Sequence, residues 1–206
     1  CGSFVIYDSE CHIRYFDALT RNEILMKAIV CDRPFSLEIE ERPVPERKAG
    51  EVMIRIRRVG LCGTDYHIFS GDQPFLAYPR VMGHELAGEV VEADEGAAWE
   101  VGQLVTVNPY IPCGDCIACR KSKPNCCVKI NVLGVHVDGG MTEFICVPAA
   151  AVIPVDGLTP DQAAMVEFLS VGAHAVRRGQ TTKGDRALVV GAGPIGVGVA
   201  LFCKFA

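Results

Sequence analysis

Short runs in which hydrophobic and polar residues alternate fill most of the first 155 positions. The clearest lies at 51–59, where Val52, Ile54 and Ile56 alternate with Met53 and two arginines. A period of two residues predicts a half-buried β-strand. Many short strands at irregular spacing favour a partly open barrel over a parallel sheet. The other expected strands lie at 28–31, 37–39, 85–92, 103–108, 144–147 and 151–154.

The pattern changes after Asp156. Thr159, Pro160 and Gln162 have the spacing of a helix N-terminus with a capping box and a proline in its first turn. The periodicity therefore predicts a mainly β unit over 26–155 and the beginning of an α/β unit over 156–206. The elements expected in this second unit are helices at 163–168 and 171–178, a strand at 186–190 and a helix at 197–205.

Charge and hydropathy narrow the range of partners. The chain has 20 Lys and Arg against 25 Asp and Glu, and its net charge is −5. An acidic chain lacks the basic surface that nucleic acid requires. No apolar run reaches the ~18 residues of a membrane-spanning helix. We therefore expect neither a nucleic-acid nor a membrane partner.

The first 25 residues differ from the rest. They lack the apolar core of a secretory signal and the Arg- and Ser-rich composition of an organellar transit peptide. Met26 opens a new pattern and resembles a natural start, so residues 1–25 are expected to be a translated upstream segment or a poorly ordered extension. The alternative is that Phe4–Tyr7 forms an additional strand or helix.

The chain contains 11 cysteines, and this odd number argues against a closed disulfide framework. Without a secretory signal, clustered cysteines are more often metal ligands in a reducing compartment. The cytoplasm is therefore the expected location.

Four of the cysteines stand at C-x2-C-x2-C-x7-C within 110–130, on a segment rich in turn residues. Zinc in structural sites takes four tetrahedral thiolate or imidazole ligands, which this spacing supplies. An iron–sulfur cluster also takes four thiolates, and four unrelated loop cysteines are the plain alternative. Cys126 competes with its neighbour for the fourth place. The expected ligands are Cys113, Cys116, Cys119 and Cys127.

A second group of candidate metal ligands would leave one coordination position of the metal open. Cys62 follows the strand at 51–59, His84 comes about twenty residues later, and Glu167 lies at the end of the capped helix. A catalytic zinc has three protein ligands and leaves a position for water or substrate, and Cys62 and His84 would be two of them. Asp65 is of the right type to accept the second ring proton of His84. Each residue alone also has an ordinary explanation. His84 can be a structural histidine, Cys62 a buried thiol and Glu167 a solvent-facing helix residue.

Two further residues near Cys62 can carry a proton. Thr64 offers a hydroxyl, and His67 offers a base that titrates near physiological pH. Together they would move a proton from a zinc-bound alcohol to solvent.

A glycine-rich turn, Gly191-x-Gly193-x-x-Gly196, lies between an expected strand and an expected helix. That context is required of a dinucleotide-binding turn, in which the pyrophosphate sits on the helix N-terminus. A tight β–α turn without a ligand is the alternative. The residue about 20 positions on, which distinguishes NAD from NADP, lies beyond Ala206.

The order and spacing of these motifs resemble the zinc-dependent medium-chain alcohol and polyol dehydrogenases. The resemblance runs from Met26 to Ala206. It implies a GroES-like catalytic domain over 26–155 with a structural zinc lobe, followed by the first strand and helix of an incomplete Rossmann domain. The matching motifs are CGTDYH at 62–67, GHELAGEV at 83–90, CGDCIACRKSKPNCC at 113–127, DGGMTEF at 138–144 and VVGAGPIG at 189–196.

The resemblance also implies roles around a catalytic zinc. Cys62 and His84 would bind the metal, and Glu85 would lie beside it and exchange with its water. Glu167 falls where many alcohol dehydrogenases have a third cysteine ligand, and a glutamate there is more like the polyol and sugar-acid branch. It would bind zinc directly or through water. Thr64 and His67 would form the proton relay.

Two other sites follow from the resemblance. The four cysteines of the lobe would hold a structural zinc, which makes two zinc ions per chain. NAD or NADP would lie against the glycine-rich turn. The residues that would contact its pyrophosphate are Gly191, Gly193, Pro194, Ile195 and Gly196.

The activity so implied is oxidation of a secondary alcohol of a polyol or sugar acid by hydride transfer to NAD(P). The stretch HIFSGDQPFLAYPRVMGHE is similar to oxidoreductases that act on galactonate- or gulonate-like sugar acids. One alternative is a related enal or quinone reductase, although that zinc-free branch usually lacks Cys62, His84 and the cysteine lobe. The other is a non-catalytic zinc-binding fragment. The full-length protein is expected to be a homodimer or homotetramer.

Overall fold

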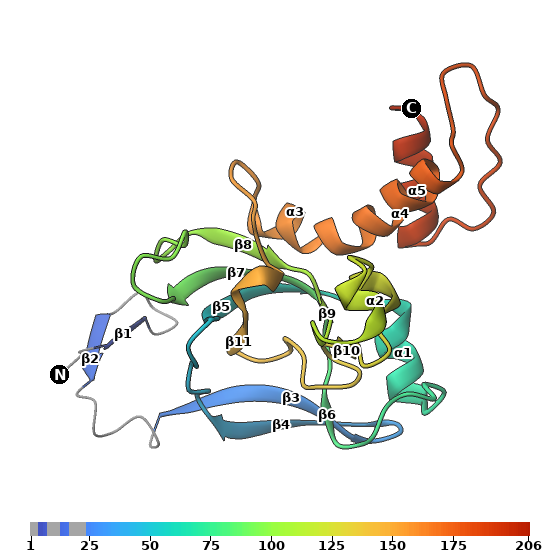
Figure 1. Cartoon of the computed structure of the whole chain (residues 1–206). Coiled ribbons are helices and arrows are strands. Elements are labelled where there is room, and N and C mark those ends of the chain that lie inside the picture. The colour runs from blue at the N-terminus through green and yellow to red at the C-terminus, as the bar shows by residue number, and fades with distance from the viewer. Residues whose placement is uncertain (1–3, 8–12, 17–23) are drawn as a thin grey trace.

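Antiparallel strands form most of the molecule up to residue 154, in a computed structural model that describes residues 4–7, 13–16 and 24–206 (Figure 1). Two open sheets make up the body, and the expectation of a mainly β, partly open barrel is confirmed. The larger sheet has the order β11-β5-β7-β8-β12, with β11 Phe144–Pro148, β5 Glu51–Gly60, β7 Glu85–Glu92, β8 Leu104–Val107 and β12 Val152–Pro154. The smaller has the order β4-β3-β6, with β4 Ser36–Pro43, β3 Leu25–Arg33 and β6 Arg80–Val81.

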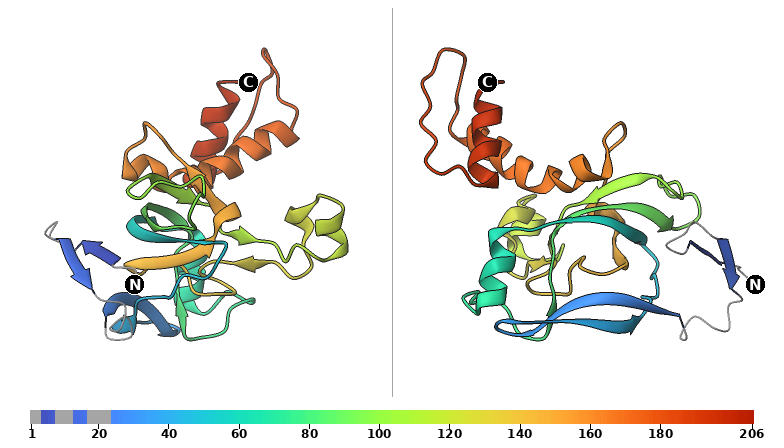
Figure 2. Two further views of the ribbon diagram at one scale, coloured as in Figure 1. Left: turned by 60° about the vertical axis from the view of Figure 1, so that its left-hand side comes forward. Right: turned by 180° about the vertical axis from the view of Figure 1, so that it is seen from behind.

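Two strand pairs lie outside these sheets. β9 (Tyr110–Ile111) pairs with β10 (Asn131–Val132) at the base of a lobe that projects from the body (Figure 2). β1 (Phe4–Tyr7) pairs with β2 (Ile13–Phe16). The additional strand considered for Phe4–Tyr7 therefore forms, and most other residues of the expected 1–25 extension lie outside the described residues.

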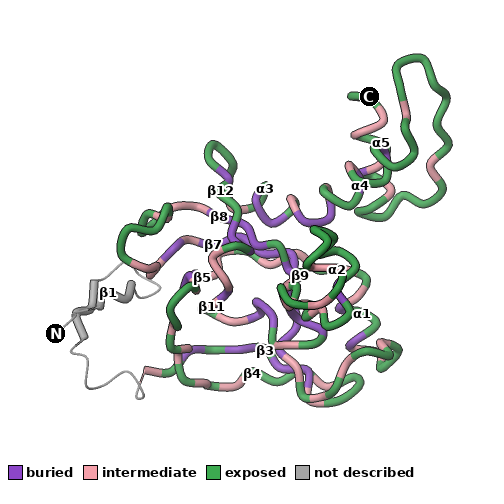
Figure 3. The backbone as a smooth tube through the Cα atoms, viewed as in Figure 1, coloured by how far each residue is buried: buried purple, intermediate pink, exposed green. Residues whose placement is uncertain are grey.

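The main hydrophobic core lies against the five-stranded sheet, where purple segments gather in Figure 3. Ile54, Leu86, Val105 and Val147 are fully buried. The hydroxyl of Thr106, also buried, donates to the Leu86 carbonyl at 2.7 Å, so this polar group is satisfied inside the core. The central strands are thus fixed by apolar burial, which sets the position of their ends.

A second core cluster joins the smaller sheet to helix α1 (Gly63–Ser70). Ile68 is fully buried against Val30 and Val81. No helix was predicted at 63–70, because the sequence there has no apolar stripe and buries only Asp65 and Ile68. The helix instead begins with a capping box between Cys62 and Asp65.

The capped helix after Asp156 forms as predicted, with different boundaries. Helix α3 spans Pro160–Ala164, and α4 spans Val166–Arg178. The break lies at Met165 and not between 168 and 171, because neither Leu169 nor Ser170 breaks a helix. Glu167 therefore lies in the first turn of α4, which corrects its expected place at the end of the capped helix.

The C-terminal region departs furthest from the prediction. The strand expected at 186–190 does not form: Leu188 and Val190 are each 89% exposed. A strand needs a neighbour to pair its backbone groups, and the described residues provide none beside it. Helix α5 spans Pro194–Cys203 and packs against α4. It begins three residues before the expected start at 197, because Pro194 fits the first position of a helix.

The remaining short helices belong to the lobe and to the turn before β12. No helix among the described residues is long and apolar enough to cross a membrane. The short helices are α2 (Ile117–Arg120), η2 (Pro124–Cys126) and η3 (Ala149–Ala151).

Thr159→Ala tests the cap of α3. The Thr159 hydroxyl accepts from Gln162 N at 3.3 Å, and the Gln162 side chain accepts from Thr159 N at 2.9 Å. Loss of such a cap lowers the free energy of unfolding by about 1 kcal/mol. Urea unfolding is expected to show this loss for Thr159→Ala and not for Thr159→Ser, which keeps the oxygen. Equal stability of the two variants would contradict the capping role.

Candidate metal centres

The end of the β5–β7 ladder brings three potential metal ligands together. Cys62 follows β5 and caps α1, and His84 and Glu85 stand at the start of β7. The two strands pair so that Gly60 lies opposite Glu85. The ligand atoms of Cys62, His84 and Glu85 all lie within 4.8 Å of one another. Antiparallel pairing therefore joins residues that are more than twenty positions apart in the sequence.

The chemistry of this group suits a divalent cation. His84 and Glu85 are 5% and 4% exposed, and Glu167 close by is 8% exposed. Burial is the main cause that raises the pKa of both Glu85 and Glu167, and each carboxylate is near the other. Buried charges of one sign are costly unless they are paired or bind a metal. A thiol, an imidazole and a carboxylate form a donor set that zinc accepts.

The thiol and the imidazole of the group interact with each other. The side-chain hydrogen bond with His84 is the main cause that lowers the pKa of Cys62. Burial lowers the pKa of His84, but the hydrogen bond with Cys62 and the charge of Asp65 outweigh it, and the pKa is raised. The contact with His84 thereby favours the thiolate of Cys62, which is the form that binds metal.

Asp65 connects the two segments that carry the ligands. Its carboxylate accepts from Cys62 N at 2.9 Å and from Gly83 N at 3.2 Å. Its distance to His84 Nδ1 is 4.0 Å, beyond a hydrogen bond, and Nδ1 is buried with no hydrogen-bond partner among the described residues. The hydrogen bond expected from His84 to Asp65 therefore does not form, and the Asp65 carboxylate bonds to backbone N–H groups instead.

The two candidate relay residues lie on α1. Thr64 is half-buried, and its Oγ1 lies 3.7 Å from the sulfur of Cys62. His67 is exposed. Residues three apart on a helix are neighbours on its surface, so the pair extends from the ligand group to solvent.

Glu167 reaches the same region from α4. It lies outside the set of atoms within 4.8 Å, although its charge acts on His84 and Glu85. Tyr110, at the start of β9, forms a side-chain hydrogen bond with Glu167. Nothing in the sequence pattern pointed to Tyr110, because the sequence does not show that the base of the lobe lies beside α4.

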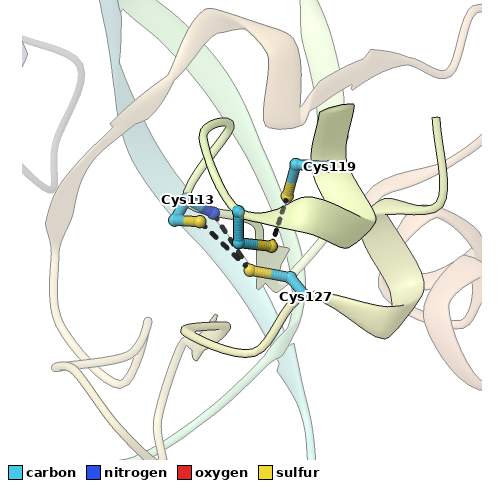
Figure 4. Close-up of side chains that lie close together, drawn as sticks. Cys113, Cys119 and Cys127 are labelled. Carbon is cyan, nitrogen blue, oxygen red and sulfur yellow. Dashed lines mark hydrogen bonds between the residues drawn. The ribbon is translucent and has the colours of Figure 1, made fainter. Parts of the chain in front are cut away.

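The lobe brings four sulfur atoms together, and Figure 4 shows those of Cys113, Cys119 and Cys127 pointing toward one another. The Cys116 and Cys119 sulfurs are 3.5 Å apart, as are those of Cys113 and Cys127. Tetrahedral zinc with bonds of about 2.3 Å places its sulfur ligands about 3.8 Å apart. All four lie within 4.8 Å of one another, and the described cysteines are free of disulfides.

Backbone N–H groups also donate hydrogen bonds to the sulfur atoms of the lobe. Hydrogen bonds from the backbone of Cys119 and Val128 are the main causes that lower the pKa of Cys116 to about 6. Cys113 N and Lys129 N donate to the sulfur of Cys127 at 3.3 and 3.4 Å. These donors favour the thiolate of Cys116 and Cys127. A side-chain hydrogen bond with Asp115 instead raises the pKa of Cys113 to about 12, and burial raises the pKa of Cys119.

Cys126, the competing fourth ligand, points elsewhere. It is exposed, and its sulfur accepts from the Asn125 side chain at 3.5 Å. Cys127 is buried and belongs to the four-sulfur group. The two adjacent residues thus have opposite environments.

The glycine-rich turn precedes α5 and is largely exposed. Gly191 has a φ of +103°, which favours glycine. A Cβ at Gly196 would lie 1.9 Å from the Gly191 carbonyl oxygen, so the turn is too tight for a side chain there. Pro194 and Ile195 occupy the first two positions of the helix. The tight turn before a helix is present, but the strand expected before it is missing, so the dinucleotide-binding role stays a prediction.

Comparison with protein families identifies this architecture. Residues 48–157, more than half of the chain, match the alcohol dehydrogenase GroES-like domain. The chain belongs to this family, which confirms the resemblance drawn from its motifs.

Curated relatives carry dehydrogenase names among others. L-galactonate-5-dehydrogenase of Escherichia coli is 46% identical over 180 residues, which cover 87% of this chain and 53% of that protein. Starvation-sensing protein RspB of Escherichia coli is 42% identical over 181 residues, with the same two coverages. The chain therefore spans about half the length of these relatives.

Solved structures of related proteins have a similar fold over the shared length. RspB from E. coli, described as a short chain alcohol dehydrogenase complexed with NADH, matches with a TM-score of 0.81 at 40% identity, over 87% of this chain and 53% of that one. Galactitol-1-phosphate dehydrogenase from Escherichia coli matches with a TM-score of 0.78 at 31% identity, over 87% and 54%.

Cobalt binding distinguishes the two adjacent cysteines. Cys127→Ser is expected to remove one of four thiolates and to weaken the intense sulfur-to-cobalt absorption of a Co²⁺-loaded lobe. Cys126→Ser, the matched control, is expected to leave that absorption unchanged, because its sulfur lies outside the group. A weaker absorption in Cys126→Ser and an unchanged one in Cys127→Ser would show that Cys126 is the ligand.

Proposed function

We propose that this chain is the zinc-binding half of an oxidoreductase that oxidises a secondary alcohol by hydride transfer to NAD(P). The observation that carries the proposal is the group of half-buried Cys62 with buried His84 and Glu85 at the end of the β5–β7 ladder. It is an open donor set, since three side chains leave a fourth position for another molecule. The dehydrogenase names of several relatives support the reaction type.

The residues of this site would have different roles in the reaction. Cys62, His84 and Glu85 would hold zinc, which as a Lewis acid favours loss of the alcohol proton. Thr64, next to the Cys62 sulfur, would accept that proton and pass it to exposed His67. Asp65 would hold the ligand segments together through its two backbone hydrogen bonds.

Glu167 would act on the same site from α4. Its buried carboxylate and its hydrogen bond to Tyr110 suit a group that binds a zinc-bound water or substitutes for Glu85. A glutamate here also agrees with the polyol and sugar-acid branch. A sugar acid related to galactonate is the substrate class we favour, because the L-galactonate-5-dehydrogenase of E. coli is 46% identical over the shared length.

The lobe and the glycine-rich turn would serve the same reaction indirectly. Cys113, Cys116, Cys119 and Cys127 would hold a second, structural zinc, because four protein ligands leave no open position. The turn at 191–196 would receive the pyrophosphate of NAD or NADP.

The domain arrangement we propose follows from these sites. Residues 26–155 form the GroES-like catalytic domain, 110–130 its zinc lobe, and 156–206 the beginning of the Rossmann domain. The free cysteines of the described residues fit a reducing compartment such as the cytoplasm. The whole protein would act as a homodimer or homotetramer on a small-molecule substrate.

Metal analysis tests the two-site proposal. The purified 206-residue chain is expected to bind two zinc ions, and Cys62→Ala is expected to bind one while the lobe keeps its own. Inductively coupled plasma mass spectrometry after gel filtration measures the ratio. A single zinc ion in the unaltered chain would indicate that only the lobe binds metal, as in a non-catalytic zinc module.

Activity tests the reaction itself. In a protein that joins this chain to the second half found in its relatives, Cys62→Ala is expected to lower kcat/KM for a sugar acid by at least about a thousandfold, since the group that stabilises transition-state charge is lost. NAD(P)H absorbance follows the reaction. Normal turnover by the variant would rule out the zinc-dependent mechanism.

A further inference from the structure

Gly60 and Glu85 face each other across the β5–β7 ladder at the metal group. A Cβ placed on Gly60 would lie 2.1 Å from Glu85 Oε2 and 2.8 Å from Glu85 Cβ. Both distances are far below van der Waals contact. The Glu85 side chain therefore lies directly over the bare backbone of Gly60.

Backbone conformation does not explain this glycine. Gly60 is paired within a strand, and its φ lies outside the left-handed region in which glycine is favoured. Glycine inside a strand also weakens it, because the unfolded chain has more freedom to lose. The space that Gly60 leaves for Glu85 is therefore the feature that accounts for it.

Two buried glutamates can supply a carboxylate to the same group, because the Asp65 carboxylate already accepts from backbone N–H groups. Glu85 enters from β7 and lies within 4.8 Å of the Cys62 and His84 ligand atoms, whereas Glu167 enters from α4 and lies outside that set. A side chain at position 60 would push the Glu85 carboxylate away from its present place. Of the two glutamates, Glu167 would then be the one that remains near Cys62 and His84.

We propose that Gly60 is a positioning residue that selects Glu85 as the carboxylate of the open metal group. The inference rests on the proposed metal-binding role of that group. Gly60 touches neither metal nor substrate in this account. It acts through the volume that it leaves empty, which allows the Glu85 carboxylate to lie over the strand beside Cys62.

The packing part of the proposal is tested without metal, by a thermal double-mutant cycle on the chelator-treated 206-residue chain. Gly60→Ala is expected to lower Tm by at least about 2–4 °C, as overpacking does in a domain of this size. In the Glu85→Gly background, the same change is expected to cost less than half as much, because both contacting groups are gone. An equal cost in the two backgrounds would overturn the proposal.

Gly88 provides the matched control on the same ladder. A Cβ there would meet the Arg55 carbonyl oxygen at 2.4 Å and Ile54 Cγ2 at 2.5 Å, and neither atom belongs to Glu85. Gly88→Ala is expected to lower Tm equally in both backgrounds. If Gly60→Ala fails to fold, a folded Gly60→Ala/Glu85→Gly double variant supports the proposal, and an unfolded one contradicts it.

Metal affinity tests the selection of the ligand. By Co²⁺ titration, Gly60→Ala is expected to bind the second ion at least roughly tenfold more weakly, as when a ligand loses its support, with the lobe unaffected. Gly88→Ala is expected to bind both ions as the unaltered chain does. Unchanged affinity in Gly60→Ala would overturn the selection. If the unaltered chain binds only one ion, the proposed function and this selection both fail, whereas the thermal cycle still decides the packing.

Discussion

The antiparallel pairing of β5 with β7 is the constraint on which the rest of the structure depends. The core fixes both strands through fully buried residues such as Ile54 and Leu86. Their register then places Cys62 after one strand and His84 and Glu85 at the start of the other. Asp65 secures the same end of the ladder through the backbone of Cys62 and Gly83. A shift of one residue in this register would turn Glu85 to the opposite face of the sheet, and Glu85 would no longer lie beside Cys62 and His84.

The charges of this group favour the binding of a cation. Cys62, His84, Glu85 and Glu167 occupy one partly dry region, where carboxylates alone would repel each other. A divalent cation removes that conflict, and the same conflict explains why such a group would bind one tightly. The lobe instead gathers four sulfur atoms, and backbone N–H groups lower the pKa of Cys116 and Cys127 among them. We propose that the three-ligand group serves chemistry and that the four-sulfur group serves stability.

Local patterns predicted much of this fold. Alternation located the strands of the five-stranded sheet, and the capping box located α3. Both were predictable because each signal is contained in a few consecutive residues. Cysteine spacing likewise predicted the lobe. Helix α1 escaped prediction, since its cap uses Cys62 and Asp65 and its buried face is too small to show a period.

Other features depend on contacts that no local pattern contains. The strand expected at 186–190 has the right composition, but a strand also needs a partner, and none of the described residues pairs with it. The meeting of Tyr110 with Glu167, and of Gly60 with Glu85, depends on how distant segments pack. The choice between Glu85 and Glu167 as the nearer carboxylate therefore required the structure, as did the choice between Cys126 and Cys127.

Anomalous diffraction at the zinc absorption edge, from crystals of the zinc-loaded chain, tests the central claim most directly. Two peaks are expected. One lies among the four sulfurs of the lobe, and the other lies between Cys62, His84 and Glu85 at the end of the β5–β7 ladder. A map with a peak in the lobe alone, or with a second zinc bound by Glu167 while Glu85 points away, would contradict the account.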